Sequence, residues 1–215
     1  MKRGGRYDIS GLVEAQSEPG SRGTVLKNLL GIKKKREIDQ TEARELKRAE
    51  DTLFRIYDEA HQFTAQDICK IHKTWLGEIY EWAGKYRKVN LGKGTFPFAY
   101  ALQIPQLMEE LDRGPLRRNT PCRFDSRERI IEALAEVHTE LVLIHPFREG
   151  NGRTARILAT LMTLQAGLPL LDFSAIRGVQ KQKYFRAVQA GLDKNYKPME
   201  EIFSLVIRKT LKKIS

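Results

Sequence analysis

The stretch "HPFREGNGRTAR", from His145 to Arg156, holds the residues of this chain that are best suited to chemistry. Gly150 and Gly152 allow a turn in which backbone N–H groups converge, and a helix that starts there adds the positive end of its dipole. Such a turn is suited to binding phosphate. Arg153 and Arg156 share one face of the first helical turn, so they can hold further phosphate oxygens.

Two further groups in this stretch could act on a bound phosphate. A neutral imidazole at His145 could accept a proton from an incoming hydroxyl group. Glu149 offers a hard oxygen, the kind of ligand that holds Mg²⁺ when substrate phosphates supply the others. The set predicts a site for phosphoryl or nucleotidyl transfer. The alternative is an ordinary charged loop, in which the histidine caps a helix and the arginines form surface ion pairs.

Two amphipathic helices must position the stretch. Residues 125–144 place apolar side chains at helical spacing, with Asp125 as the expected N-cap. Residues 153–167 continue as a second helix that ends at Gly167. These two helices would hold the loop between them.

The rest of the chain is also predicted to be mainly helical. Upstream helices are expected over residues 39–59, capped by Thr41, and over residues 64–84, capped by Thr64 and ended by Gly84. Residues 86–98 predict a short exposed hairpin. The C-terminal region offers two more helices.

Composition sets the broad class of the protein. With 215 residues, 41% of them hydrophobic and 30% charged, the chain should fold as one domain. Its net charge of +11 suits a nucleotide, a nucleic acid or an acidic protein surface, without choosing between them. The two cysteines form no CxxC pair, and the start of the chain carries no apolar segment, so we expect a cytoplasmic protein that does not enter the membrane. Delivery into another cell stays open.

The stretch 145–156 resembles the signature of the Fic domain (filamentation induced by cyclic AMP), H-x-F-x-[DE]-G-N-G-R-x-x-R, at every specified position. The resemblance extends through "GTVLKNLLGI", "IHKTWLGEIYEWAGKYRKVNLGKG" and the C-terminal helices. It implies a mainly α protein with the Fic fold, a helical bundle with the active-site loop between two central helices and a short β-hairpin flap. We expect one Fic-type domain over residues 1–215, with a lead-in (1–40) and a helical core (41–208) that includes the flap (86–98) and the signature loop (145–156).

The resemblance also implies an activity: a protein adenylyltransferase that moves AMP from ATP to a hydroxyl side chain of a target protein and releases pyrophosphate. His145 would be the general base, Phe147 would anchor the loop in the core, and Glu149 would ligate Mg²⁺. The remaining implied ATP-binding residues are Gly150, Asn151 and Gly152 as the anion hole, Arg153 and Arg156 on the downstream phosphates, and Tyr184 and Phe185 beside adenine.

The same resemblance implies a docking partner and a possible restraint on activity. The flap would dock a target protein, with Lys93, Gly94, Thr95 and Phe96 as the registering residues. Many Fic proteins are restrained by [ST]-x-x-x-E-[GN], and "SGLVEA" places Ser10 and Glu14 at that spacing, so we hypothesise that Glu14 pairs with Arg156. The alternative is a capped short helix with a solvated Glu14. A separate antitoxin-like inhibitor and a homo-oligomer are left open.

The competing functions belong to different classes. Other Fic-type activities, namely removal of AMP or transfer of UMP or phosphocholine, share the signature. A non-enzymatic basic module that binds phosphate or nucleic acid is the alternative outside the enzymes, although such a module would not need His145 and Glu149 together. We therefore favour the transferase, and nucleic acid is a minor candidate as a partner.

Overall fold

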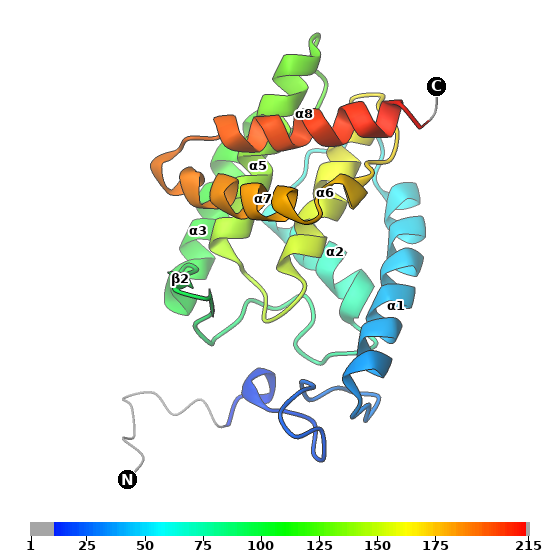
Figure 1. Ribbon diagram of the computed structural model, residues 1–215, viewed down its shortest axis with the longest axis vertical. Coiled ribbons are helices and arrows are strands. Elements are labelled where there is room, and N and C mark those ends of the chain that lie inside the picture. The colour runs from blue at the N-terminus through cyan, green and yellow to red at the C-terminus, as the bar shows by residue number, and fades with distance from the viewer. Residues whose placement is uncertain (1–10, 214–215) are drawn as a thin grey trace.

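In this computed structural model, which describes residues 11–213, the chain folds around two central helices that are joined by the signature loop (Figure 1). These are α5 (Arg127–Ile144) and α6 (Asn151–Gln165). The other α-helices, in chain order, are α1 (Lys35–Ile56), α2 (Ala65–Leu76), α3 (Ile104–Leu111), α4 (Arg117–Asn119), α7 (Val179–Ala190) and α8 (Lys197–Leu211). Short helical turns are η1 (Val13–Ala15), η2 (Ala101–Gln103), η3 (Asp112–Leu116), η4 (Phe173–Ala175) and η5 (Gly191–Asp193).

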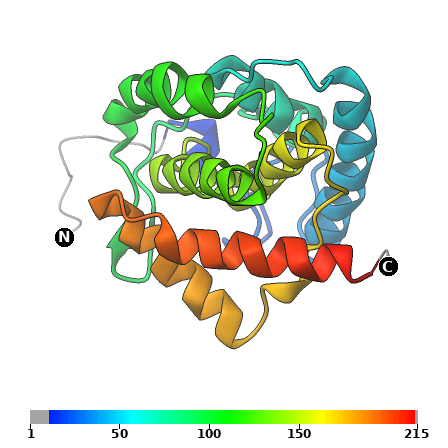
Figure 2. The ribbon, with the colours of Figure 1, turned by 90° about the horizontal axis from the view of Figure 1, so that it is seen from above.

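Helix α5 forms the centre of the molecule. Figure 2 shows it enclosed by the other helices, and it packs against α3, α6, α7 and α8. Its apolar stripe is buried as the sequence predicts: Ile130, Leu134, Val137, Leu141 and Ile144. Because α5 is packed on several sides, its last turn is a rigid base for the loop that follows.

The helix starts confirm one predicted cap and correct two others. Thr64 is the N-cap of α2 as predicted: its side chain accepts a hydrogen bond from Asp67 N, and the Asp67 carboxylate accepts from Thr64 N, which completes a capping box. Helix α5 is capped by Ser126, not Asp125, because the Ser126 hydroxyl accepts from Arg129 N at 3.2 Å. Helix α1 begins at Lys35, so Thr41 lies inside it. The reason is that the run before Thr41 consists largely of good helix formers.

The predicted end of the second helix is also wrong. Helix α2 ends at Leu76 with Gly77 as its C-cap, and the chain then turns back on itself before Gly84. Gly84 has a φ of +76°, and a Cβ there would lie 2.9 Å from the carbonyl oxygen of Cys69. This glycine therefore serves a close approach between the turn and α2.

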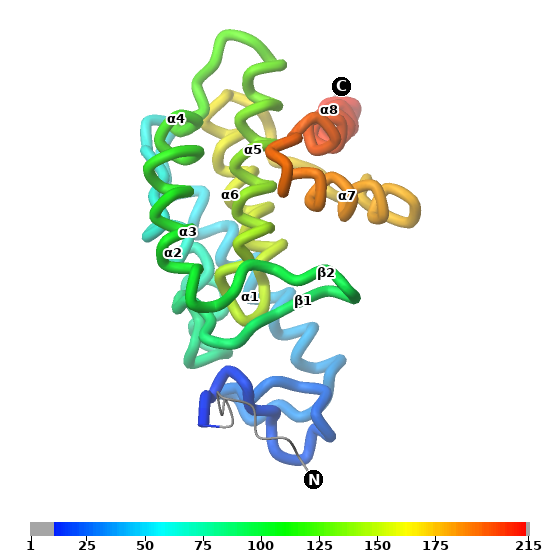
Figure 3. The backbone as a smooth tube through the Cα atoms, turned by 90° about the vertical axis from the view of Figure 1, so that its left-hand side faces the viewer, coloured from blue at the N-terminus to red at the C-terminus, as the bar shows by residue number. Residues whose placement is uncertain are grey.

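The predicted hairpin is present but shorter than residues 86–98. Strands β1 (Gly92–Lys93) and β2 (Phe96–Pro97) are antiparallel, with Gly92 opposite Pro97 and Lys93 opposite Phe96. Figure 3 shows the hairpin projecting beneath α7. Residues 11–34 form a separate lobe of loops beyond the start of α1, with one bridge between Ser17 and Leu26. None of the helices in the described part is long and apolar enough to cross a membrane.

Candidate active site

His145 lies where α5 ends, in a backbone conformation that non-glycine residues rarely adopt. Its φ and ψ are +52° and +57°, and its N–H donates to Leu141 O. Nδ1 lies 3.0 Å from Val142 O, and since a carbonyl can only accept, Nδ1 carries the proton and Nε2 keeps its lone pair. The Phe98 ring stacks on the imidazole at 3.6 Å. The histidine is therefore held in one orientation and one tautomer.

The charge state of His145 suits a proton acceptor. Burial lowers its pKa to about 4, and the nearby cations Arg87 and Lys93 act in the same direction. The carbonyl of Val142 and the carboxylate of Glu149 act against this shift. At neutral pH the imidazole is consequently neutral and able to take up a proton.

The loop after His145 is fixed by contacts that leave its backbone little freedom. Phe147 is fully buried and stacks on His72 at 3.9 Å, so it anchors the loop in the core. The Asn151 side chain accepts from Phe147 N at 2.8 Å and donates to Phe147 O at 2.7 Å. His72 accepts a hydrogen bond from Gly84 N at Nδ1 and therefore donates from Nε2 to Glu149 O. Burial lowers the pKa of His72 to about 4, which keeps it neutral in this role.

The start of α6 has the geometry expected of an anion-binding turn. Gly150 is its N-cap with a φ of +83°, and no side chain in the described part of the molecule caps the helix. The first backbone bond of the helix runs from Thr154 N to Gly150 O, so the N–H groups of residues 151–153 precede the helical ladder. Together with the helix dipole they provide donors for a phosphate.

Arg153 is held by carboxylates on two elements. Its Nη1 lies 2.8 Å from Glu42 Oε2 of α1, and its Nη2 lies 3.2 Å from Glu149 Oε1. Its guanidinium also lies over Trp75, 4.4 Å from the ring centroid. Glu42 is buried and accepts a second bond from Tyr80 OH at 2.7 Å. Arg153 is thus fixed in place before any ligand arrives.

Arg156 has a different environment, made of aromatic rings. Its guanidinium carbon lies 5.4 Å from the centroid of Phe173 and 5.9 Å from that of Tyr184. Tyr184 is in turn hydrogen-bonded to the buried His138, Nε2 to OH, at 2.8 Å. The Nε of Arg156 is buried and has no hydrogen-bond partner among residues 11–213. This guanidinium retains donor capacity for a ligand.

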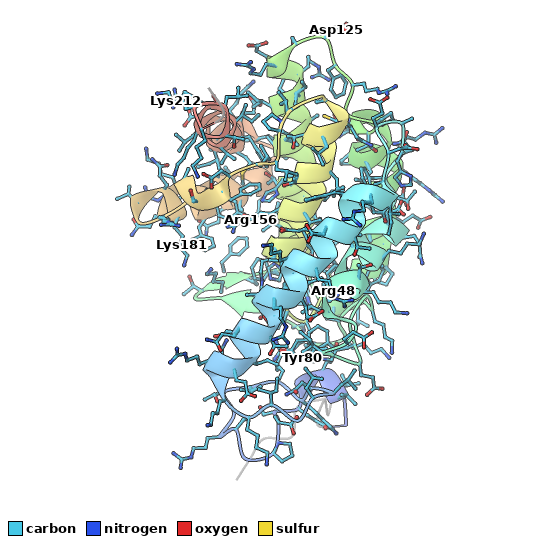
Figure 4. The ribbon with its side chains drawn as sticks, turned by 90° about the vertical axis from the view of Figure 1, so that its right-hand side faces the viewer. Arg48, Tyr80, Asp125, Arg156, Lys181 and Lys212 are labelled. Atoms are coloured by element: carbon cyan, nitrogen blue, oxygen red, sulfur yellow. The ribbon has the colours of Figure 1, made fainter. Side chains whose placement is uncertain are left out.

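These residues surround a pocket of about 760 Å³. Helix α7 overhangs it and the hairpin flanks it, on the side of the molecule where Arg156 and Lys181 are labelled in Figure 4. The charged side chains that line the pocket are the cations Lys93, Arg148, Arg153, Arg156 and Lys181 and the carboxylate Glu149. This excess of positive charge favours a strongly anionic ligand.

The flap residues divide between the pocket and its edge. Lys93 and Phe96 line the pocket, whereas Gly94 and Thr95 form the exposed turn between the strands. Lys93 Nζ lies 3.5 Å above the Phe185 ring of α7, so the hairpin touches the opposite wall. Partial burial and Lys181 lower the pKa of Lys93.

The predicted pair between Glu14 and Arg156 is not present. The Glu14 carboxylate accepts from Lys88 N at 2.6 Å, and its carbonyl accepts from Arg148 Nε at 2.8 Å. Glu14 is buried, so the alternative of a solvated side chain is also wrong. Its role in this structure is to join the N-terminal lobe to the loop before the flap. Ser10 lies outside the described residues.

Several residues that shape the site were not predicted from the sequence. Glu42 had a usable signal, because it falls on the same helical face as Leu46, Ala49 and Leu53, where a carboxylate needs a partner. No sequence signal marks Arg87, Phe98 or Lys181, because they become important only when distant segments meet in the folded protein. They contact or line the site from the loop before β1, from the end of the hairpin and from α7.

The residues present fit a metal ion that is held largely by substrate. No cluster of three or more His, Cys, Asp or Glu side chains that could hold a metal occurs within residues 11–213. Among the described residues that line the pocket, Glu149 is the single carboxylate, and its side chain is about half exposed beside the anion-binding turn. One hard oxygen with phosphate and water as the other ligands is the set that Mg²⁺ favours.

Comparison with known proteins agrees with the signature. Residues 62–163 match the sequence profile of the Fic/DOC family. Protein adenylyltransferase VbhT of Bartonella schoenbuchensis is 31% identical over 196 residues, covering 87% of this chain and 37% of VbhT. The probable protein adenylyltransferase Fic of Escherichia coli is 30% identical over 142 residues, covering 64% of this chain and 66% of that protein. The chain thus spans less than two thirds of either relative.

A solved structure shares the architecture. It is the N-terminal Fic domain of a VirB-translocated Bep effector protein from Bartonella quintana, with bound ADP. The TM-score is 0.67 and the identity 29%, over 84% of this chain and 89% of that one.

Proposed function

Because the chain belongs to the Fic/DOC family through residues 62–163, we propose that it transfers AMP from ATP to a hydroxyl side chain of a target protein and releases pyrophosphate. One observation carries the proposal. A neutral His145, with Nδ1 bonded to Val142 O, lines the same cationic pocket as the uncapped start of α6. A proton acceptor beside a phosphate-binding turn is the arrangement that this transfer requires.

In the proposed reaction, His145 Nε2 takes the proton from the target hydroxyl while the hydroxyl oxygen attacks the α-phosphorus of ATP. A new P–O bond forms to the target, the bond between the α- and β-phosphates breaks, and pyrophosphate leaves. The N–H groups of residues 151–153 stabilise the negative charge that develops on the phosphate oxygens. Because His145 is already held by Val142 and Phe98, little reorganisation is needed before the transfer.

The two motif arginines bind the leaving part of the nucleotide. Arg153 and Arg156 lie one helical turn apart on α6, and both line the pocket. Glu149 is the residue that would hold Mg²⁺, which when bound supplies charge neutralisation between adjacent phosphates. Glu149 would exchange its contact with Arg153 for that role. Tyr184 and Phe185 form the wall that we assign to the adenine base.

The flap is the proposed docking place for the target. Within the described residues its two strands pair only with each other, so their outer edges remain available for main-chain pairing with an extended segment. Lys93, Gly94, Thr95 and Phe96 would set the register of that segment against His145. A separate antitoxin-like protein would inhibit by placing a carboxylate against Arg156, whose Nε has no partner in the described region. We place the reaction in the cytoplasm, either of the producing cell or of a cell into which the protein is delivered.

The proposal is tested with ATP labelled at the α-phosphate and, in parallel, at the γ-phosphate, incubated with Mg²⁺ in a bacterial lysate. Wild type should label a protein band from the α-labelled ATP alone, and His145→Ala should not. Labelling from γ-labelled ATP would indicate phosphoryl transfer instead. Absence of label with wild type, combined with salt-sensitive binding of nucleic acid, would favour the non-enzymatic module.

A further inference from the structure

Arg87 is a fully buried cation in the connection between α2 and β1, 1% exposed. Within residues 11–213 the charge of Glu14 favours the protonated guanidinium, but Arg87 forms no direct ion pair, and its N–H groups donate to backbone carbonyls. Nε bonds His145 O at 2.7 Å, Nη1 bonds Val89 O at 2.6 Å, and Nη2 bonds Ala99 O at 2.6 Å and Ile144 O at 3.4 Å. A buried charge is expensive unless it is fully hydrogen-bonded, so this set of contacts needs a reason.

The carbonyls belong to two parts of the site. Ile144 and His145 end α5, where carbonyl groups have no partner within the helix and a cation is favourable. Val89 and Ala99 stand on either side of the hairpin, one before β1 and one after β2. One guanidinium therefore ties the end of the central helix to both feet of the flap.

The same contacts restrain the side chain of His145. Its left-handed backbone is costly for a non-glycine residue and persists only where neighbours hold it. Arg87 bonds the carbonyl of His145 through Nε, and its own N–H donates to Pro146 O at 2.8 Å. Phe98, next to Ala99, stacks on the imidazole. Movement of Arg87 would thus disturb both the backbone of His145 and the ring that covers it.

We infer that Arg87 is a positioning residue that sets the distance between His145 and the target-docking flap, so that a target held by the flap presents its hydroxyl to Nε2. This inference rests on the proposed function, because it concerns the two groups that would meet the target. The start of α6 is held separately, by the bonds between Asn151 and Phe147. Nucleotide binding should therefore depend little on Arg87, whereas transfer should depend on it strongly.

The test compares Arg87→Met and Arg87→Lys with wild type and with Arg117→Met, an exposed arginine on α4 that serves as the matched control. Three quantities are measured: label transfer to the lysate band at saturating ATP, the Kd for an ATP analogue with a non-cleavable α,β bridge, and hydrogen–deuterium exchange of the backbone. If Arg87→Met does not fold, Arg87→Lys carries the test, because it keeps the charge and an N–H donor.

The inference predicts that transfer falls about 100-fold in Arg87→Met and about 10-fold in Arg87→Lys, since small displacements of a reacting group have effects of this size. The Kd for the analogue should stay within about threefold of wild type, because the phosphate-binding turn keeps its own contacts. Exchange should rise in residues 88–100 and 144–146 and stay unchanged in α6. Arg117→Met should behave as wild type.

Two results would overturn the inference. One is transfer by Arg87→Met at the wild-type rate with unchanged exchange in the flap. The other is loss of analogue binding together with a lower Tm in both variants, which would mean that Arg87 supports the domain as a whole. Absence of transfer by wild type itself would count against the proposed function instead, and the exchange measurement would then decide alone whether Arg87 holds the flap to α5.

Discussion

Gly150→Ala and Gly152→Ala should change the stability of the fold in opposite directions, although only one residue separates the two positions. Gly150 has a φ of +83°, and a Cβ there would lie 2.6 Å from Cζ3 of Trp75 and 3.2 Å from Cδ1 of Leu76. Gly152 lies inside α6, and a Cβ there would meet nothing within 4 Å. The two substitutions therefore give a matched comparison within the signature stretch.

The magnitude for Gly150→Ala follows from two costs. A left-handed conformation costs a non-glycine residue about 1–2 kcal/mol. The clash adds about 1–3 kcal/mol, the usual range for overpacking, because Trp75 is fully buried and its Nε1 bonds Glu42 O at 2.9 Å, so it has little room to move. We expect a total loss of about 2–5 kcal/mol, which is a large part of the stability of an ordinary domain.

Gly152→Ala should instead stabilise the fold by about 0.5–1 kcal/mol, because alanine is a better helix former than glycine. Thermal unfolding followed by circular dichroism measures both variants. For a chain of this size we expect Gly150→Ala to lower Tm by roughly 5–15 °C and Gly152→Ala to raise it by a few degrees. A Tm for Gly150→Ala equal to that of wild type would refute the packing argument, and an equal loss in both variants would show that the effect does not come from Trp75.

Three further predictions concern the groups around the loop. Glu42→Gln removes the shorter of the two ion pairs that hold Arg153, so the affinity for an ATP analogue with Mg²⁺ should fall about 10-fold in a titration, as is typical when a supporting partner is lost. Asn151→Ala leaves buried backbone groups of the loop unpaired and should lower the free energy of unfolding in urea by about 2 kcal/mol. Burial lowers the pKa of His72 to about 4 and that of His138 to about 3, below the value of a histidine in the unfolded chain. The unfolded chain therefore binds more protons than the folded protein as the pH falls below about 6.5. Urea unfolding at pH 5.5 should show about 1 kcal/mol less stability per histidine than at pH 7.

Each of these predictions has a contrary result. Glu37→Gln, an exposed change in the first turn of α1, is the control for Glu42→Gln; equal affinities in the two variants would remove the role of Glu42. If Asn151→Ala unfolded at the same urea concentration as wild type, water would be replacing the hydrogen bonds of the Asn151 side chain. Equal stability at pH 5.5 and pH 7 would show that the buried histidines are not neutral in the folded state.

Much of the architecture could be predicted because it follows from amphipathic patterns. The stripe of α5, the cap at Thr64 and the turn at Gly150 are local signals, and the structure contains all three. The fold class is confirmed: the chain is mainly helical, with one short hairpin, and resembles solved Fic domains. Local chemistry and the observed structure agree where a segment decides its own conformation.

The predictions failed where packing between distant segments decides. Along α1, Ala43 and Ile56 recur at helical spacing with Leu46, Ala49 and Leu53, which predicts an inward position for them. Both are exposed, whereas Glu42 and Thr41 are buried. The carboxylate of Glu42 is tolerated inside because Arg153 and Tyr80 complete its hydrogen bonds, and these lie far away in the sequence.

The contacts of Glu14 and Arg87 could not be predicted from the sequence, for the same reason. Glu14 bonds Lys88 N, and Arg87 bonds carbonyls of α5 and of the flap. The motif around Glu14 predicts the wrong partner, Arg156, and no periodic pattern or short-range motif indicates the partners of Arg87. Buried polar groups in loops are placed by the whole fold, because their partners come from several segments at once.

The mass of the modified acceptor protein shows whether His145 directs transfer of AMP. The protein band that takes up label is isolated after incubation with ATP and Mg²⁺, and its intact mass and modified side chain are determined. We expect a gain equal to one AMP group on a hydroxyl side chain, with release of one pyrophosphate for each group added, and no gain with His145→Ala. A gain equal to a phosphate group, or an AMP group added equally well by His145→Ala, would contradict this expectation.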